Sequence, residues 1–281
     1  MDTFWADYSP KPKTGEIYGC YKIEKKMTET NSSILMLAKD KRDSTLKVLK
    51  FVKYKKAHSN RFDSEIKIMD MFDHPNILKY EYSIFQAPYL IIATKYAQFD
   101  NLFEFVKKYY KDGMPEEKVR KIMRQILESI KILHNQEICH RDIKPQNFLV
   151  YDKYPEIKIK LSDFGMAKHF NSNEKSTEFV GTALYSAPEI YLKEPYDKNI
   201  DIWSAGVTMF VLLTNNSPFN ESDIRNPISR QIIRGKLNYL LLKFCDISEE
   251  ATEMIKKMCR VHPDNRLSAK ELLDDPWMTK K

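Results

Sequence analysis

Acidic, amide and basic side chains that suit phosphoryl transfer stand close together in the middle of the chain. Asp142 and Asn147 are five residues apart, and Lys144 lies between them. A carboxylate can accept the proton of an attacking hydroxyl, an amide oxygen can hold Mg²⁺, and a lysine can reach the transferring phosphate. Sixteen residues after Asn147 comes Asp163-Phe164-Gly165, where a carboxylate oxygen suits a second metal contact and the glycine permits a sharp turn. The spacing predicts a metal-assisted phosphoryl-transfer site.

The chain before this site has a pattern typical of strands. Three short apolar or alternating runs, separated by polar turns, are Ile34–Ala38, Leu46–Phe51 and Tyr89–Ala93. One helix interrupts them, with Ser59 or Asn60 as its cap and a break at His74-Pro75. We expect a small β-rich lobe over residues 21–96. Residues 1–20, with two prolines and two glycines but little periodicity, indicate an extended N-terminal arm.

The chain after Tyr96 has a helical pattern. An apolar stripe from Val119 to Leu133 follows Pro115 at helical spacing, and Asn199 to Leu213 is apolar enough to be a buried helix. Helices are also expected over Ser248–Cys259 and Ser268–Asp275. The fold class is therefore α+β, with a β-rich lobe followed by a larger helical lobe over residues 97–281 and a crossing near residues 95–97.

Five motifs in order resemble those of eukaryotic protein kinases. His140–Asn147 and Asp163-Phe164-Gly165 are similar to the catalytic and metal loops of that family. Ala187-Pro188-Glu189 resembles the end of its activation segment, Asp201–Gly206 its central buried helix, and Arg266 the partner of Glu189. The resemblance extends from about Tyr21 to Trp277. It implies one kinase domain with the bilobal kinase fold, which binds ATP and Mg²⁺ and phosphorylates protein hydroxyls.

The resemblance also implies roles for individual residues. Lys50 is similar to the strand lysine that contacts the α- and β-phosphates, and Glu65 to the helix glutamate that pairs with it. Asp142 and Lys144 would carry the transfer, with Asn147 and Asp163 on the metal. His140 would help to tie the two lobes together rather than carry a proton. Residues that would enclose the nucleotide are Leu35, Val48, Thr94, Lys95, Tyr96, Ala97 and Leu149.

The chain departs from the family at the glycine-rich loop. Thr28, Thr30 and Ser33 stand where the three glycines are expected, and no glycine occurs between Gly19 and Gly113. Side chains at these positions obstruct close backbone approach to phosphates and remove positive-φ conformations. We expect weaker ATP binding rather than none, although hydroxyl-bearing residues could simply tolerate the hairpin. The departure raises an alternative, a nucleotide-binding pseudokinase that acts as a scaffold or allosteric partner.

Regulation would centre on a basic pocket of Arg61, Arg141 and Lys168. In activated relatives such a pocket receives a phosphate of the activation segment. Glu178 occupies the position where the phosphorylated threonine usually lies, so a carboxylate could fill the pocket permanently. Phosphorylation of Ser176 or Thr177 is the alternative, and the sequence leaves both open.

The acceptor and the kinase group follow from further matches. Lys144 and Thr182, the latter on the floor of the substrate site, favour serine or threonine as the acceptor. Pro263–Ser268 and Pro276-Trp277 resemble the calcium/calmodulin-dependent-like group. Positions that often read an upstream arginine are not acidic here, so we expect a weak or altered preference for basic substrates. These positions are Asn101, Gln146 and Val211.

Composition limits the location and the partners. The formal net charge is +7, with much of the excess between Lys22 and Lys56, which indicates a solvated basic face more readily than an acidic, membrane or nucleic-acid partner. The four scattered cysteines show no metal-type pairing, and no signal peptide or membrane-spanning run is present. We therefore expect a monomer in the cytoplasm or nucleus. Its partners would be a protein substrate and an upstream kinase, without nucleic acid or membrane.

Overall fold

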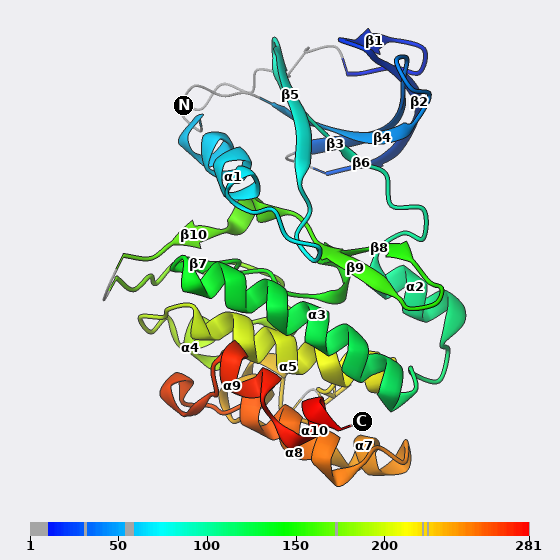
Figure 1. The fold of residues 1–281 in the computed structure, drawn as a ribbon. Coiled ribbons are helices and arrows are strands. Elements are labelled where there is room, and N and C mark those ends of the chain that lie inside the picture. The colour runs from blue at the N-terminus through cyan, green and yellow to red at the C-terminus, as the bar shows by residue number, and fades with distance from the viewer. Residues whose placement is uncertain are drawn as a thin grey trace. The chain divides into compact units, whose positions relative to one another are not determined.

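The computed structural model describes residues 11–30, 33–53, 59–171, 174–220, 222–223 and 225–280, with the backbone alone at 59–64. These residues form two units, a β-rich N-lobe and a larger helical C-lobe (Figure 1). The N-lobe takes the described residues up to Asp73 together with Leu78–Tyr96. The C-lobe takes His74–Ile77 and the chain from Ala97 onward. The predicted α+β fold class is confirmed.

The N-lobe is one antiparallel sheet of six strands in the order β1-β2-β3-β4-β6-β5, with one helix, α1 (Ser59–Met71). The strands are β1 (Ile17–Tyr18), β2 (Tyr21–Glu29), β3 (Ser33–Asp40), β4 (Leu46–Lys53), β5 (Tyr80–Gln86) and β6 (Tyr89–Lys95). The three predicted strand runs lie in β3, β4 and β6. Since neighbours in the sheet are mostly neighbours in sequence, hairpins build most of it.

One face of the N-lobe sheet carries the core. Alternate residues of the strands point to that face, so the core gathers aliphatic and aromatic side chains at period two. They are Tyr21, Ile23, Ile34, Met36, Ala38, Leu49, Phe51, Tyr89, Ile91 and Ala93. Lys50 alternates with Leu49 and Phe51 on β4 and therefore lies on the opposite face.

The prediction of an extended N-terminal arm over residues 1–20 is partly wrong. Residues 1–10 lie outside the described residues, but Ile17 and Tyr18 form β1 and pair with Lys22 and Tyr21 of β2. The Tyr18 ring packs edge-on against Phe51 with centroids 4.8 Å apart. The short strand was missed because two residues are too few to show a period.

The C-lobe is mainly helical. Its helices are α2 (Leu102–Tyr109), α3 (Glu116–Asn135), α4 (Pro188–Leu192), α5 (Asn199–Thr214), α6 (Ile228–Ile233), α7 (Tyr239–Phe244), α8 (Glu249–Met258), α9 (Ala269–Leu273) and α10 (Pro276–Thr279). Its short strands are β7 (Ile138–Cys139), β8 (Phe148–Asp152), β9 (Lys158–Leu161) and β10 (Lys168–His169). In Figure 1, α3 and α5 run side by side, as their contacts require.

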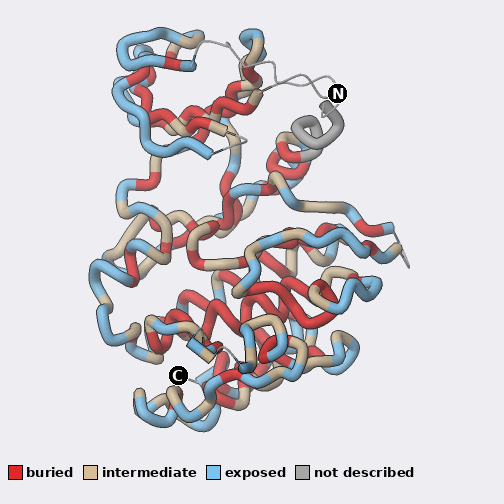
Figure 2. The backbone as a smooth tube through the Cα atoms, turned by 180° about the vertical axis from the view of Figure 1, so that it is seen from behind, coloured by how far each residue is buried: buried red, intermediate tan, exposed pale blue. Residues whose placement is uncertain are grey.

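Helix α5 lies at the centre of the C-lobe. All of its residues from Ile200 to Thr214 are buried, because α3, α7 and α8 pack around it. Figure 2 shows this buried interior beneath an exposed surface. Gly206 of α5 allows the close contact with α8, since a Cβ there would lie 2.5 Å from the Cys259 sulfur. None of the helices in the described residues is long and apolar enough to cross a membrane.

Helix ends follow local capping signals. Ser248 caps α8 by accepting from the Ala251 amide, and Ser268 forms a capping box with Glu271 at α9. The helix predicted over Ser268–Asp275 is present as α9, which ends two residues earlier, at Leu273. Asp274 is the C-cap of α9, and Asp275 caps the separate helix α10 by accepting from the Trp277 amide. Pro276 takes the first position of α10, where it cannot continue the preceding hydrogen-bond ladder.

Candidate active site

A buried carboxylate of α5, that of Asp201, fixes the loop that carries Asp142. Asp201 accepts hydrogen bonds from the backbone amides of His140 and Arg141 at 2.8 and 2.9 Å, and His134 Nε2 lies 3.0 Å from it. Burial alone would raise the pKa of Asp201, but the contacts with His134 and with His140 lower it. The carboxylate stays ionised and holds the loop. The family motif placed Asp201 only in a buried helix, although an acid in an otherwise apolar helix is itself a sign of a buried hydrogen-bonding role.

Both oxygens of Asp142 are held by side-chain donors. The Thr182 hydroxyl donates to Oδ1 at 2.8 Å, while Lys144 Nζ lies 2.7 Å from Oδ2. Asn147 Nδ2 donates to Oδ2 at 2.9 Å and to the Asp142 carbonyl at 2.7 Å. Lys144 also donates to the Thr182 hydroxyl at 2.6 Å. The arrangement fixes one carboxylate, one ammonium and one hydroxyl in a single cluster. Thr182 is thus part of the site itself.

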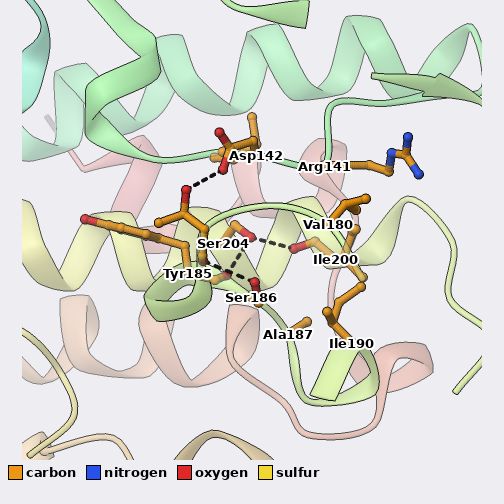
Figure 3. Close-up of a pocket in the computed structure, with 11 residues that line it drawn as sticks. Arg141, Asp142, Val180, Tyr185, Ser186, Ala187, Ile190, Ile200 and Ser204 are labelled. Atoms are coloured by element: carbon orange, nitrogen blue, oxygen red, sulfur yellow. Dashed lines mark hydrogen bonds between the residues drawn. The ribbon is translucent and has the colours of Figure 1, made fainter. Parts of the chain in front are cut away.

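The adjacent residues Arg141 and Asp142 point in different directions (Figure 3). Arg141 has a left-handed backbone with φ of 68°, a costly conformation for a side chain of this size. Both residues line a small pocket together with Tyr185, Ile190 and Ile200. The backbone at Arg141 therefore sends the carboxylate to one side of the loop and the guanidinium to the other.

Asn147 and Asp163 are joined through Ser162. The Ser162 amide and hydroxyl both donate to the Asn147 carbonyl at 2.8 Å, which places the next residue, Asp163, beside Asn147. Asp163 has φ of 60° and ψ of 73°. The sharp turn predicted at Gly165 lies at Asp163 instead, because the glycine belongs to the short 3-10 helix Phe164–Met166.

The chemistry of this pair fits Mg²⁺. Since the Asn147 amide nitrogen is committed to Asp142, its amide oxygen is the atom available for a cation. Mg²⁺ prefers oxygen ligands and is often held by one or two protein groups together with water and phosphate. In the part of the chain that the structure describes, no group of three or more His, Cys, Asp or Glu could hold a metal alone. A cation here would be shared with a phosphate-bearing substrate.

His140 is a buried structural residue within the C-lobe, and its part in tying the two lobes together stays a prediction. Its side chain is fully buried, its Nε2 lies 3.1 Å from the Ser162 carbonyl oxygen, and its ring meets Phe164 edge-on at 5.2 Å. These contacts connect the catalytic loop to the Asp163 loop. A proton carrier would need access to solvent or substrate, which the buried ring lacks.

The N-lobe contributes a lysine and glutamate pair. Lys50 Nζ on β4 lies 2.7 Å from Glu65 Oε1 on α1, and the Glu65 side chain is almost completely buried. The predicted pairing is therefore present. A buried carboxylate that holds an ammonium on the face of the sheet opposite the core keeps that charge in one place, as a contact to phosphate oxygens requires.

The residues predicted to enclose a nucleotide are placed within each lobe separately. Leu35 pairs with Lys50 and Val48 pairs with Thr94 in the N-lobe sheet, so Leu35 and Val48 are on the Lys50 face. Thr94 and Lys95 end β6, and Tyr96 donates its amide to the Leu46 carbonyl at 3.4 Å. In the C-lobe, Ala97 is buried, and Leu149 of β8 forms a bridge with Asn101. Their role in binding stays a prediction.

The hairpin that lacks glycines is closed by hydroxyl groups. Thr30 donates its amide to the Ser33 carbonyl at 2.8 Å, and the Ser33 amide donates back to the Thr30 hydroxyl at 3.1 Å. Thr28 stays in the ladder, opposite Leu35. Residues 31–32 lie outside the described residues. The side chain of Thr30 thus takes one backbone amide of the hairpin, which a glycine would leave available.

The family comparison decides which chemistry these residues belong to. The family described as protein kinase domain matches residues 21–278. The chain belongs to the protein kinase family. This kinase is 36% identical over 277 residues to calcium-dependent protein kinase 3 of Plasmodium berghei (strain Anka), covering 97% of this chain and 46% of the relative. The predicted family is confirmed.

Two further relatives agree with the predicted kinase group. Calcium-dependent protein kinase 4 of Plasmodium falciparum (isolate 3D7) is 35% identical over 218 residues, with 76% of this chain and 40% of the relative covered. Calcium/calmodulin-dependent protein kinase type 1 of Macrobrachium nipponense is 33% identical over 254 residues, with 88% and 71% covered. The chain spans about half the length of the Plasmodium relatives it matches.

The activation segment of this kinase places its predicted regulatory residues unequally. Arg141 Nη1 lies 2.7 Å from Glu178 Oε2, and Lys168 Nζ lies 3.1 Å from Glu174 Oε1. Ser176 is buried and Thr177 is exposed. The Arg61 side chain lies outside the described residues. The contact between Glu178 and Arg141 agrees with the sequence prediction. The ion pair between Glu174 and Lys168 was not predicted.

The end of the activation segment is locked to the rest of the kinase C-lobe. Arg266 donates to both oxygens of Glu189 at 2.6 and 2.8 Å, and both side chains are almost completely buried. The guanidinium also donates to backbone carbonyls and lies over the Trp203 ring at 5.3 Å. This pair was predicted from the motif spacing and is confirmed.

Proposed function

We propose that the chain is an ATP- and Mg²⁺-dependent protein serine/threonine kinase. The single observation that carries this proposal is the cluster of Asp142, Lys144, Asn147 and Thr182, in which both carboxylate oxygens are held by side-chain donors. A carboxylate so fixed can accept the proton of an incoming hydroxyl, while the neighbouring ammonium offsets charge on the transferring phosphate. Family membership supports the same reaction.

The remaining residues would hold the nucleotide. Lys50, kept in place by Glu65, would contact the nucleotide phosphates from the N-lobe, and Asn147 and Asp163 would hold the cation. Bound Mg²⁺ would supply positive charge that offsets the charge on the β- and γ-phosphates. The chain's own groups position the hydroxyl and the phosphate, and little covalent chemistry is left for them to perform.

The substrate proposal follows from the same cluster. Lys144 donates to the Thr182 hydroxyl, and both lie beside Asp142, which agrees with a serine or threonine acceptor. Asn101, one of the three non-acidic positions, uses its side chain to cap α2 by accepting from the Glu104 amide. Because this position holds a neutral side chain that caps a helix, it offers no carboxylate to a substrate arginine. This supports a weak or altered preference for an upstream arginine. Action as a monomer in the cytoplasm or nucleus, without membrane or nucleic-acid partners, remains a proposal from the sequence.

The decisive experiment compares the wild-type chain with Asp142→Asn in Mg·ATP and a mixture of peptides. The substitution keeps the shape of the side chain but removes the proton acceptor, so phosphate transfer should fall about 10²- to 10⁴-fold while ATP binding persists. Lys50→Met should instead weaken ATP binding. ATP binding without turnover that depends on Asp142 would contradict the enzyme and favour the pseudokinase scaffold.

A further inference from the structure

Helix α7 is apolar on its outer face as well as on its inner face. Leu242 is fully buried where α7 packs on α5, as expected for a helix that covers a core. Leu240 and Phe244 lie one turn apart on the outer face, where they are 69% and 84% exposed. Among the described residues, Phe244 is the most exposed large apolar side chain. A surface helix usually turns polar residues away from the core, so this face of α7 lacks the partner that its composition suits.

Local contacts hold α7 in place. The Asn238 side chain caps the helix by accepting from the Leu241 amide at 3.3 Å, and the Asn238 amide donates to the Pro218 carbonyl at 2.8 Å. Helix α8 lies beside α7 (Figure 1), and Lys256 Nζ of α8 is 5.6 Å from the centre of the Tyr239 ring. A face presented by a helix that is already fixed needs little ordering when a partner binds.

The chain around α7 is strongly basic. From Arg225 to Asp246 there are five basic residues and one acid, Asp246, so the stretch has a formal charge of +4. The acids of the neighbouring α8 do not neutralise it, because Glu249 and Glu253 both pair with Lys256. The basic residues of the stretch are all exposed, and within the described part of the chain none of them forms an ion pair. They are Arg225, Arg230, Arg234, Lys236 and Lys243.

Part of this charge lies directly beside the exposed apolar residues. Lys243 is on α7 itself, three residues after Leu240 and one before Phe244, so it borders both side chains. Lys236 precedes Leu240 by four residues, which limits the distance between their Cα atoms to about 14 Å. One short extended peptide can therefore contact the apolar pair and the ammonium groups together.

We propose that the outer face of α7 is a docking site for an acidic segment of a protein substrate, with an apolar side chain as its anchor. The anchor covers Leu240 and Phe244, and the carboxylates of the segment pair with Lys236 and Lys243. The proposal rests on the proposed kinase function. It gives this kinase a source of substrate affinity away from the active site, where the positions that often read a substrate arginine are not acidic.

The small size of the apolar face favours a peptide over a lipid surface. Binding of a helix to a membrane grows with the apolar area that it buries, and α7 offers two exposed apolar side chains on six residues. Binding of a peptide can depend on one or two anchors surrounded by complementary charge.

The first test measures binding to the full chain without ATP. The probe is a fluorescent peptide that carries one phenylalanine among glutamates and no hydroxyl-bearing residue, and its anisotropy reports binding. Phe244→Gln and Lys243→Glu should each weaken binding about tenfold, because the first removes apolar contact area and the second reverses a charge. Tyr154→Gln and Lys270→Glu are matched controls, since they change an exposed aromatic and an exposed lysine elsewhere in the C-lobe, and both should bind as wild type does.

The binding test has further readouts. All four side chains are exposed, so the melting temperatures of the variants should stay close to that of wild type. Affinity should fall as salt rises, because salt screens exposed charges. Equal affinity of wild type and Phe244→Gln would overturn the docking site. Dimerisation that depends on Phe244, or Phe244-dependent binding to vesicles of anionic lipid without binding of the peptide, would assign the face to another occupant and overturn the proposal.

The second test joins the same acidic segment to a serine-containing peptide substrate. In wild type the segment should lower the KM for the peptide about tenfold and leave kcat unchanged, because docking raises the local concentration of the serine. Phe244→Gln should lose this advantage and still phosphorylate the plain peptide as wild type does. Turnover of the plain peptide with no gain from the segment would overturn the docking site alone. Binding of the segment without turnover of either peptide would overturn the proposed kinase function.

Discussion

Thr182 donates its hydroxyl hydrogen to Oδ1 of Asp142 over 2.8 Å, although 40 residues separate the two in the chain. The same hydroxyl accepts a hydrogen bond from Lys144 at 2.6 Å, so it bridges the carboxylate and the ammonium. The contact joins the activation segment directly to the proposed proton acceptor. Any change that moves the segment must therefore also move Asp142 or break this bond.

Removal of the Thr182 hydroxyl should impair turnover more than folding. Thr182→Val keeps the shape but leaves one oxygen of Asp142 without its donor, so kcat should fall about tenfold or more. Thr182→Ser retains the hydroxyl and should stay close to wild type. Steady-state kinetics at saturating ATP measure the effect, and equal kcat in the Val and Ser variants would show that the bond is unimportant.

A side chain at Gly181 should disturb the catalytic loop. Gly181 has φ of +89°, and a Cβ would lie 2.6 Å from the Arg141 carbonyl oxygen and 3.8 Å from Asp142 Oδ1. Gly181→Ala should therefore lower kcat as well as stability. Gly15 offers a matched control, because its φ is +87° and a Cβ there would meet nothing within 4 Å. Gly15→Ala should lose about 1–2 kcal/mol of stability from backbone strain and keep its kcat.

The pair of Glu189 and Arg266 should be worth more in stability than a surface ion pair. Arg266→Met would leave a buried carboxylate unpaired and should lower the free energy of unfolding by about 3–5 kcal/mol. The double variant Glu189→Leu and Arg266→Met should lose less than the two single variants added together. Urea unfolding, followed by tryptophan fluorescence because Trp203 stacks on Arg266, measures this. Additive losses would show that the partners are not coupled.

Glu116 should make the attachment of the last helix depend on pH. It accepts from Trp277 Nε1 at 2.7 Å and from the Ser248 hydroxyl at 2.8 Å, and Arg120 lies 3.6 Å away. Burial raises the pKa of Glu116, but these partners lower it below its ordinary value of 4.5. A carboxyl group whose pKa is lower in the folded state than in the unfolded state stabilises the fold at pH values above its unfolded-state pKa. This stabilisation is lost as the pH falls through the folded-state pKa.

Melting temperatures across pH check this directly. Glu116→Gln should melt a few degrees below wild type near neutral pH, and the difference should narrow below about pH 4.5. Glu117→Gln is the control, since that carboxylate is mostly exposed and pairs only with the exposed Lys121 among the described contacts. A difference that does not change with pH would mean that shape rather than charge explains the effect.

The sequence predicted the pairs that belong to motifs. Lys50 with Glu65 and Glu189 with Arg266 were expected from the order and spacing of family motifs, and strands such as β4 from their period-two pattern. Tyr196 on Arg141 and His134 on Asp201, which join positions 55 and 67 residues apart, were missed because no motif match paired these positions. No local pattern records a contact that exists only after the helices and loops have packed.

The hairpin closed by Thr30 and Ser33 has an entropic consequence. A glycine-rich loop has many accessible backbone conformations and must give them up when it orders around a nucleotide. Thr30 and Ser33 restrict the backbone in the free chain, and their mutual hydrogen bonds at 2.8 and 3.1 Å narrow it further. The proposed binding of a nucleotide would therefore cost this hairpin less conformational freedom, which would offset part of the loss of ATP affinity that we expect from the missing glycines.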